Sequence, residues 1–121
     1  MDHVGFITHR SRQILLMDAT NCSAAELIEL LTEVQRIVTV QPRNSVLTLG
    51  DLTGAKFSRD AVTRMKEVAV FDRPYVKRAA LVGAQSLPTV FYEALKTFSQ
   101  REFRRFKTRE EAMSWLVREE A

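Results

Sequence analysis

The chain of 121 residues contains only one cysteine and no long apolar run. Its single cysteine, Cys22, excludes an internal disulfide and is typical of a protein in a reducing cytoplasm. No apolar segment approaches the roughly 20 residues that a membrane-spanning helix needs. The first residues also lack the charged-then-apolar order of a secretion signal. These absences predict a cytoplasmic protein without a membrane span.

The motifs of common cofactor and nucleophile sites are absent as well. The chain has neither a GxGxxG nor a P-loop sequence, so nothing predicts a dinucleotide or nucleoside triphosphate cofactor. It has no GxSxG turn, which would present a nucleophilic serine. The two histidines, His3 and His9, have no cysteine or carboxylate at metal-ligand spacing. The sequence therefore predicts no cofactor and no metal.

What the sequence does contain is an alternation of short apolar runs and amphipathic stretches. The runs predict strands at residues 13–19, 45–52, 75–83 and 102–108, and an antiparallel edge strand at 3–10. Of the four helices that follow these runs, three have predicted N-terminal caps, at Ser23, Ser86 and Thr108, and the second is predicted to begin at about Ser58. Ser23 and Thr108 each precede a glutamate by three residues, which is the spacing of a capping box.

Repeated strand-then-helix units are typical of an α/β protein, because right-handed crossovers place helices on a mostly parallel sheet. We predict one α/β domain over residues 1–121, with a mixed, mostly parallel sheet of four to five strands and helices packed on it. In the third helix, the inward stripe is predicted to comprise Leu87, Val90, Phe91, Ala94, Leu95 and Phe98. Phe103 and Phe106 lie three residues apart, so a regular strand would place them on opposite faces.

Polar joints follow the predicted strands, at the edge of the sheet where such folds bind ligands. An enzyme there would need Asp18, Asp51 or Cys22 to converge in a cleft, and paired aspartates could hold Mg²⁺. We instead expect Asp51 to accept backbone amides in a turn, and Cys22 to pack as a small apolar residue. No catalytic residue is therefore predicted.

Positive charge is concentrated in the middle of the chain, where residues 56–109 carry 13 Lys or Arg against 5 Asp or Glu. Such a segment could contact an acidic partner or nucleic acid, or form an ordinary solvated surface. The stretch 101–109 interleaves two phenylalanines with basic residues. We interpret the phenylalanines as core and the arginines as protection of a sheet edge, so nucleic acid is not an expected partner.

The stretch Asp51-Leu52-Thr53-Gly54, followed by Phe57, resembles the signature of STAS domains, the modules of anti-sigma-factor antagonists and sulfate transporters. The likeness extends over residues 45–118 and includes the ending EEAMSWL. Asp60 stands at the position of the family's phosphorylated serine. Asp60 could mimic a permanently charged state, or Ser58 or Thr53 could substitute as the phosphorylated residue.

The resemblance implies a STAS-like bacterial regulatory module that binds proteins without catalysis. We expect an acidic partner to meet the second helix and the turn before it, through Thr53, Gly54, Ser58, Arg59, Asp60 and Arg64, with Lys66 on the same helix face. The alternative is a small-ligand or lipid-binding domain with an apolar pocket lined by Met65, Phe91 and Phe98. Either function is compatible with a homodimer, although no residue demands one.

Overall fold

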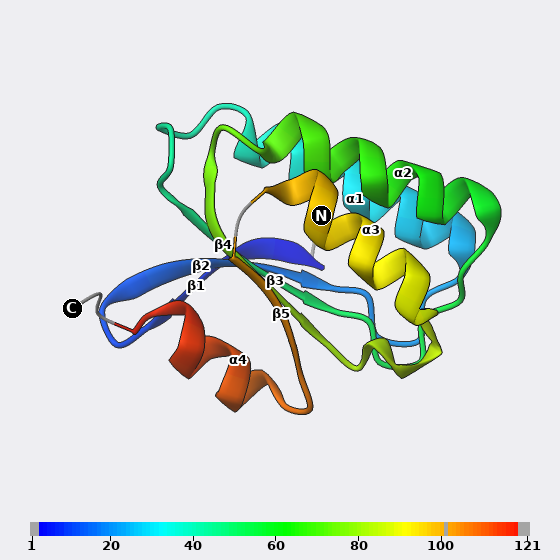
Figure 1. Ribbon diagram of the computed structural model, residues 1–121. Coiled ribbons are helices and arrows are strands. Elements are labelled where there is room, and N and C mark those ends of the chain that lie inside the picture. The colour runs from blue at the N-terminus through cyan, green and yellow to red at the C-terminus, as the bar shows by residue number, and fades with distance from the viewer. Residues whose placement is uncertain (1–2, 101, 119–121) are drawn as a thin grey trace.

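The computed structural model describes residues 3–100 and 102–118, which form the predicted mixed sheet. The strands lie in the order β1-β2-β3-β4-β5, so each strand neighbours the one before it in the chain (Figure 1). Their bounds are β1 (Val4–His9), β2 (Arg12–Asp18), β3 (Val46–Asp51), β4 (Val76–Val82) and β5 (Glu102–Phe106). β1 pairs antiparallel with β2, and every other pair is parallel, which confirms the predicted antiparallel edge strand.

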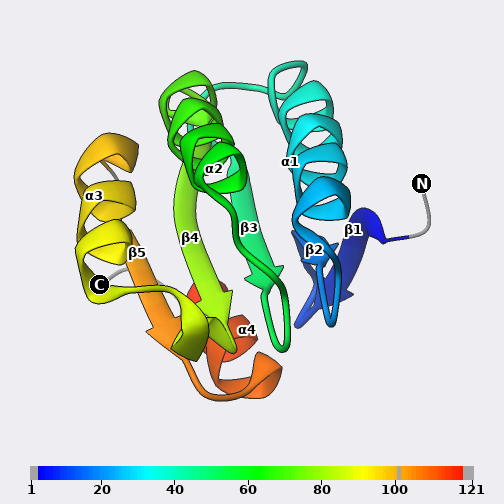
Figure 2. The same cartoon turned by 90° about the vertical axis from the view of Figure 1, so that its right-hand side faces the viewer.

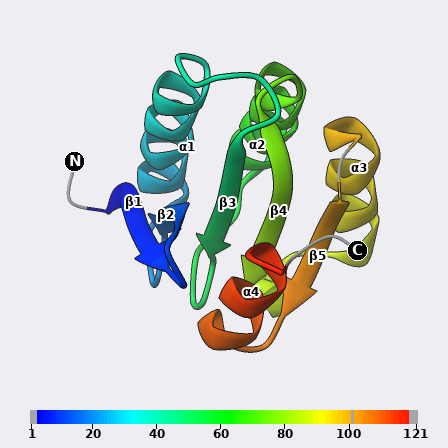
Figure 3. The ribbon, with the colours of Figure 1, turned by 90° about the vertical axis from the view of Figure 1, so that its left-hand side faces the viewer.

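The helices cover both faces of the sheet unequally. They are α1 (Ala24–Val38), α2 (Arg59–Asp72), α3 (Thr89–Ser99) and α4 (Arg109–Leu116), with a short 3₁₀ turn at Ala84–Ser86. Since strand order follows chain order and crossovers are right-handed, α1, α2 and α3 lie on one face (Figures 2 and 3). α4 follows the last strand and packs on the opposite face (Figure 1). Within the described residues, no helix has the length and apolar character to cross a membrane.

Two of the predicted helix caps are formed by the predicted residues. The hydroxyl of Ser23 accepts from the amide of Glu26 at 3.1 Å, and the Glu26 carboxylate accepts from the Ser23 amide at 2.9 Å. The hydroxyl of Thr108 accepts from the amide of Glu111 at 3.2 Å. These bonds satisfy amides that a helix leaves unpaired in its first turn, so the local sequence fixes where α1 and α4 begin.

The prediction for α3 was wrong in its start and in two residues of its expected inward stripe, Val90 and Phe98, whereas Leu87 and Leu95 are buried as expected. Ser86 belongs to the 3₁₀ turn, and the chain is extended at Leu87, so the helix begins at Thr89 with Pro88 as its cap residue. Val90 is 68% exposed and Phe98 is 41% exposed. The residues that α3 buries are Tyr92, Leu95 and Ser99.

The two faces of the sheet carry separate apolar cores. The larger core lies under α1, α2 and α3, and includes Phe103. The smaller core lies under α4, where Phe106 packs with its ring centroid 5.4 Å from that of Trp115. The predicted division of the two phenylalanines between opposite faces is therefore confirmed.

A buried arginine joins α4 to the sheet. Arg78 of β4 is only 1% exposed, and its Nη1 donates to the carbonyl oxygen of Leu116 at 2.9 Å and to that of Arg118 at 3.2 Å. These carbonyls lie at the C-terminal end of α4, where a helix leaves its last acceptors unpaired. Arg78 therefore supplies hydrogen-bond donors to the C-terminal end of α4, the helix that covers the smaller core.

Candidate functional site

The carboxyl ends of β2 and β3 carry the same Asp-X-Thr turn. Oδ1 of Asp18 accepts from the amide of Thr20 at 3.1 Å and from its hydroxyl at 2.6 Å. Oδ1 of Asp51 accepts from the amide of Thr53 at 3.0 Å and from its hydroxyl at 2.7 Å. The two aspartates are partners in the parallel register, so the turns lie side by side. The prediction that Asp51 accepts a backbone amide in a turn is confirmed.

Arg109, the first residue of α4, lies between these two carboxylates. Its Nε donates to Oδ2 of Asp51 at 2.6 Å, and its guanidinium lies 3.2 Å from Oδ1 of Asp18. Burial would raise the pKa of Asp51, but hydrogen bonds from Thr53 and Arg109 outweigh it and hold the pKa below its ordinary value. The hydroxyl of Thr20 is the main cause that lowers the pKa of Asp18. Both acids are therefore ionised and paired.

Cys22 lies beside this rim and is buried. Burial, together with the negative charges of Glu26 and Asp18, raises the pKa of its thiol above the ordinary value. A protonated thiol is a poor nucleophile, because the thiolate is the reactive form. Cys22 therefore packs as the small apolar residue that we expected. Among the described residues, no group of three or more His, Cys, Asp or Glu side chains is placed to hold a metal ion.

The turn that follows β3 is closely packed on both sides. Gly54 has a φ of +70°, and a Cβ there would collide with Oδ1 of Asn21 in the β2–α1 loop. Gly83, at the end of β4, has a φ of +67°, and its Cβ would lie 2.7 Å from Cα of Thr53. The Asn21 amide also donates to the carbonyl oxygen of Thr53 at 2.8 Å. The turn is thus fixed by both neighbouring loops.

The first turn of α2 presents polar side chains next to this rigid turn. Ser58 caps the helix, and its hydroxyl accepts from the amide of Ala61 at 3.1 Å. Ser58, Arg59 and Asp60 are all exposed. Asp60 lies at the N-terminal end of the helix, where the partial positive charge of the unpaired amides stabilises a carboxylate. The sequence placed these residues correctly at the helix start.

The basic residues farther along α2 do not share one face. Arg64 leans toward α1, where its Nε lies 3.4 Å from the hydroxyl of Thr32, and its guanidinium lies 3.9 Å from Glu67. Lys66 leans toward α3, with its Nζ 5.5 Å from the ring centroid of Phe91. The single outward face expected for Arg59, Arg64 and Lys66 is therefore divided between two neighbouring helices.

The aromatic and basic residues near β5 are arranged as a covered core edge. Phe103 is buried and Phe106 is half-buried. The guanidinium of Arg105 lies 4.0 Å from the ring centroid of Tyr92, and that of Arg104 lies 5.6 Å from Trp115. These cations lie over rings that belong to the core, and the interpretation of the two phenylalanines as core residues is confirmed. Arg101 lies outside the described residues.

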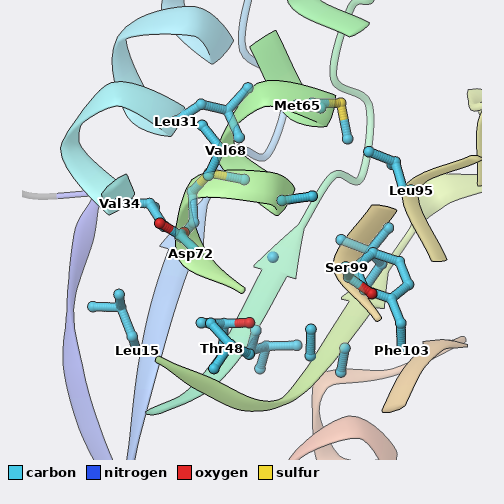
Figure 4. A pocket seen from close by; sticks show the side chains of 18 of the residues that line it. Leu15, Leu31, Val34, Thr48, Met65, Val68, Asp72, Leu95, Ser99 and Phe103 are labelled. Atoms are coloured by element: carbon cyan, nitrogen blue, oxygen red, sulfur yellow. The ribbon is translucent and has the colours of Figure 1, made fainter. Parts of the chain in front are cut away.

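A cavity of about 110 Å³ lies between the sheet and the helices α1, α2 and α3 (Figure 4). Met65 lines it, as predicted, whereas Phe91 and Phe98 do not. Asp72, which the sequence analysis did not single out, also lines it. Asp72 continues the inward stripe of Met65 and Val68 at helical spacing, and this position was a signal in the sequence for a buried acid.

The comparisons with known proteins bear on the fold. No protein-family model and no curated protein matches the chain. A solved structure of an uncharacterised protein from Shewanella loihica PV-4, of the DUF3478 family, is similar, with a TM-score of 0.73 and 17% sequence identity. The match covers 94% of this chain and 92% of that one. That structure is described as having a SpoIIAA-like fold.

This chain has a SpoIIAA-like fold. The predicted likeness to STAS domains, which share this fold, is therefore confirmed at the level of architecture. At 17% identity the similarity concerns the fold alone.

Proposed function

We propose that this chain is a non-enzymatic regulatory module that binds an acidic protein partner at the joint between β3 and α2. The proposed surface, called here the β3–α2 corner, comprises Thr53, Gly54, Ser58, Arg59, Asp60 and Arg64. The observation that carries the proposal is that all residues of this corner except the half-buried Arg64 are exposed, beside a rim whose acids are already paired. The exposed groups are available to a partner, while Asp18 and Asp51 stabilise the fold.

The rigidity of the β3–α2 corner supports this proposal. Because Gly54 packs against Asn21 and Gly83 packs against Thr53, the turn is already ordered before any partner binds. A surface that is ordered in advance loses less conformational entropy on association. Arg64 is held in the same way by its contact with Thr32.

The charges of the β3–α2 corner define the kind of partner. Arg59 and Arg64 contribute positive charge, and Lys56 is exposed just before the helix. Asp60 adds one fixed negative charge at the position where STAS domains carry a phosphorylated serine. We propose that the module presents this charge constitutively, so that its partner binding is set without a phosphorylation step.

Charge reversal tests this surface directly. The double variant Arg59→Glu/Arg64→Glu should lose the partner that co-purifies with the wild type, and the loss should be measured by quantitative mass spectrometry. The matched control is Arg12→Glu/Arg43→Glu, which changes the net charge equally at exposed sites elsewhere. Binding through exposed charges should also weaken with salt, since the screening length is about 10 Å at 0.1 M. Retention of every partner by the corner variant would refute the proposal.

The cavity favours a second function, the binding of a small apolar ligand, which does not depend on the β3–α2 corner. Its walls are mainly aliphatic and it lies between the sheet and three helices. Its volume of about 110 Å³ is below the roughly 300–1,000 Å³ of common ligand pockets. We therefore propose a compact guest for this cavity in place of a lipid chain.

A further inference from the structure

One carboxyl group lines the cavity and is almost completely buried. Asp72, the last residue of α2, is 5% exposed, and its Oδ1 has no hydrogen-bond partner among the residues that the structure describes. The other buried side-chain atoms without a partner in the described part of the chain belong to His9, Gln35 and Trp115. None of those three residues lines the cavity. The unpaired acid and the empty space therefore coincide at one place.

The surroundings of Asp72 are apolar on nearly every side. Figure 4 shows its carboxyl group beside Val34 on the α1 side of the cavity, with Ser99 and Phe103 on the opposite side. The remaining walls are mainly aliphatic, from residues such as Leu15, Leu31, Met65 and Val68. A molecule in this space would therefore meet an apolar wall over most of its surface and a single carboxyl group on one side.

The groups near Asp72 leave it short of a hydrogen-bond donor. The hydroxyl of Ser99 donates to the carbonyl oxygen of Lys96 at 3.0 Å, and Nε of Arg73 donates to that of Phe98 at 3.0 Å. Burial raises the pKa of Asp72 to about 7, and the charge of Arg64 only partly opposes this. A buried polar atom without a partner is rare in native proteins and calls for an explanation.

We infer that Asp72 is the polar anchor of a ligand site in this cavity, and that the ligand is a compact, mainly apolar molecule with one neutral hydroxyl group. The inference rests on the second proposed function, the binding of a small guest. The hydroxyl donates to the carboxyl group and supplies the missing partner, while the apolar body fills the aliphatic space. A cation is disfavoured because Arg64 and Arg73 already place positive charge near Asp72.

The size of the cavity sets the size of the ligand. An apolar protein cavity of about 150 Å³ accommodates benzene, and this cavity is somewhat smaller at about 110 Å³. The body of the ligand is therefore a single small ring or a short branched chain. Cyclobutanol and methylcyclobutane are suitable probes, since both are smaller than benzene, have the same number of non-hydrogen atoms and differ in the hydroxyl group.

An NMR titration that follows the methyl groups of Leu31, Val34 and Val68 measures the affinity of the full-length chain for each probe. We expect cyclobutanol to bind at least tenfold more tightly than methylcyclobutane at pH 7. Cyclobutylamine, which is protonated at this pH, should bind more weakly than cyclobutanol. The shifts should be confined to methyl groups that line the cavity.

Variants of Asp72 identify the source of the preference. Asp72→Leu removes the acceptor and should abolish the preference for cyclobutanol, whereas Asp72→Asn retains a carbonyl acceptor and should keep part of it. Glu93→Gln, which neutralises an exposed acid on α3 away from the cavity, should bind all three probes as the wild type does. If Asp72→Leu does not fold, the comparison of wild type with Asp72→Asn still tests the role of the carboxyl group.

The outcomes separate this inference from the function on which it rests. Equal binding of methylcyclobutane and cyclobutanol would refute the anchoring role of Asp72 and leave small-guest binding standing. Absence of binding by every probe would refute both, and would indicate a cavity that holds only water. An unchanged preference in Asp72→Leu, or tighter binding of the amine, would overturn the assignment of a neutral hydroxyl to Asp72.

Discussion

Nε of Arg109 lies 2.6 Å from Oδ2 of Asp51, and this contact joins residues 58 positions apart in the chain. Arg109 begins α4 on one face of the sheet, and Asp51 ends the strand that leads to α2 on the other face. The contact therefore links the helix over the smaller core to the turn before the β3–α2 corner. It also explains why an acid pair at the rim of the sheet is structural in this protein.

Removal of the arginine should destabilise the fold at neutral pH. We expect Arg109→Ala to lower the free energy of unfolding by about 1–3 kcal/mol, because it leaves the nearly buried Asp51 carboxylate without its cation. Urea unfolding at pH 7 measures the change. Arg59→Ala is the control, since Arg59 is exposed and its removal should change the stability by less than about 0.5 kcal/mol.

The loss of stability caused by Arg109→Ala should decrease as the pH falls. The pKa of Asp51 lies below its ordinary value of 3.8 in the folded protein. Its ionised form therefore contributes stability above that value, and the contribution is lost as the pH falls through the folded-state pKa. The free energies of unfolding of the wild type and of Arg109→Ala should therefore become similar at acidic pH. A loss of stability that is as large at pH 3 as at pH 7 would show that the Asp51 carboxylate does not contribute to the effect of Arg109→Ala.

Asp72 should produce the opposite dependence on pH. Its pKa is about 7 in the folded protein against 3.8 for an ordinary aspartate, so the folded state holds a proton that the unfolded state has released. Stability should then fall as the pH rises between these values, by up to about 1.4 kcal/mol per pH unit. Asp72→Asn should remove this slope and exceed the wild type in stability at pH 8.

Chemical unfolding at pH 5 and pH 8 checks the prediction for Asp72. Asp60→Asn serves as the control, because Asp60 is an exposed acid on the same helix and should leave the slope unchanged. An identical slope in Asp72→Asn and wild type would indicate that Asp72 titrates normally.

Substitution by alanine should affect the stability differently at Gly54 and at Gly5. Gly54→Ala places a Cβ against Asn21 at a positive φ, so we expect a loss of about 1–3 kcal/mol. Gly5 of β1 has open space around its Cα, and Gly5→Ala should be neutral or stabilise by up to about 1 kcal/mol. Thermal unfolding of both variants measures the contrast. Equal effects would mean that the turn before α2 is not constrained.

Local patterns in the sequence were sufficient to predict much of this fold. The capping box of Ser23 and Glu26 and the opposite faces of Phe103 and Phe106 depend only on spacing along the chain. The order of strands and helices followed from the alternation of apolar runs. These features are determined within a few residues, which is why they could be read without a structure.

The features that sequence reasoning missed depend on contacts between distant residues or on where a helix begins. A 3₁₀ turn precedes α3, so the helix begins later than expected, and Val90 and Phe98 of the expected inward stripe are exposed. The placement of Arg109 between two aspartates brings together α4, β2 and β3, which no local pattern reveals. Asp72 was passed over because an acid at the end of an apolar stripe is usually solvated.

Arg78 should be among the most sensitive positions, although it lies in a strand with an apolar middle. Arg78→Met keeps the aliphatic volume but leaves the carbonyl oxygens of Leu116 and Arg118 without this donor, so we expect a loss of about 2–4 kcal/mol. Trp115 is the only tryptophan and lies in α4, so its fluorescence during urea unfolding reports on that helix. Lys107→Met, at an exposed site, should change stability by less than about 0.5 kcal/mol. A methionine variant as stable as the wild type would show that α4 does not depend on Arg78, since apolar packing alone would then suffice to hold the helix.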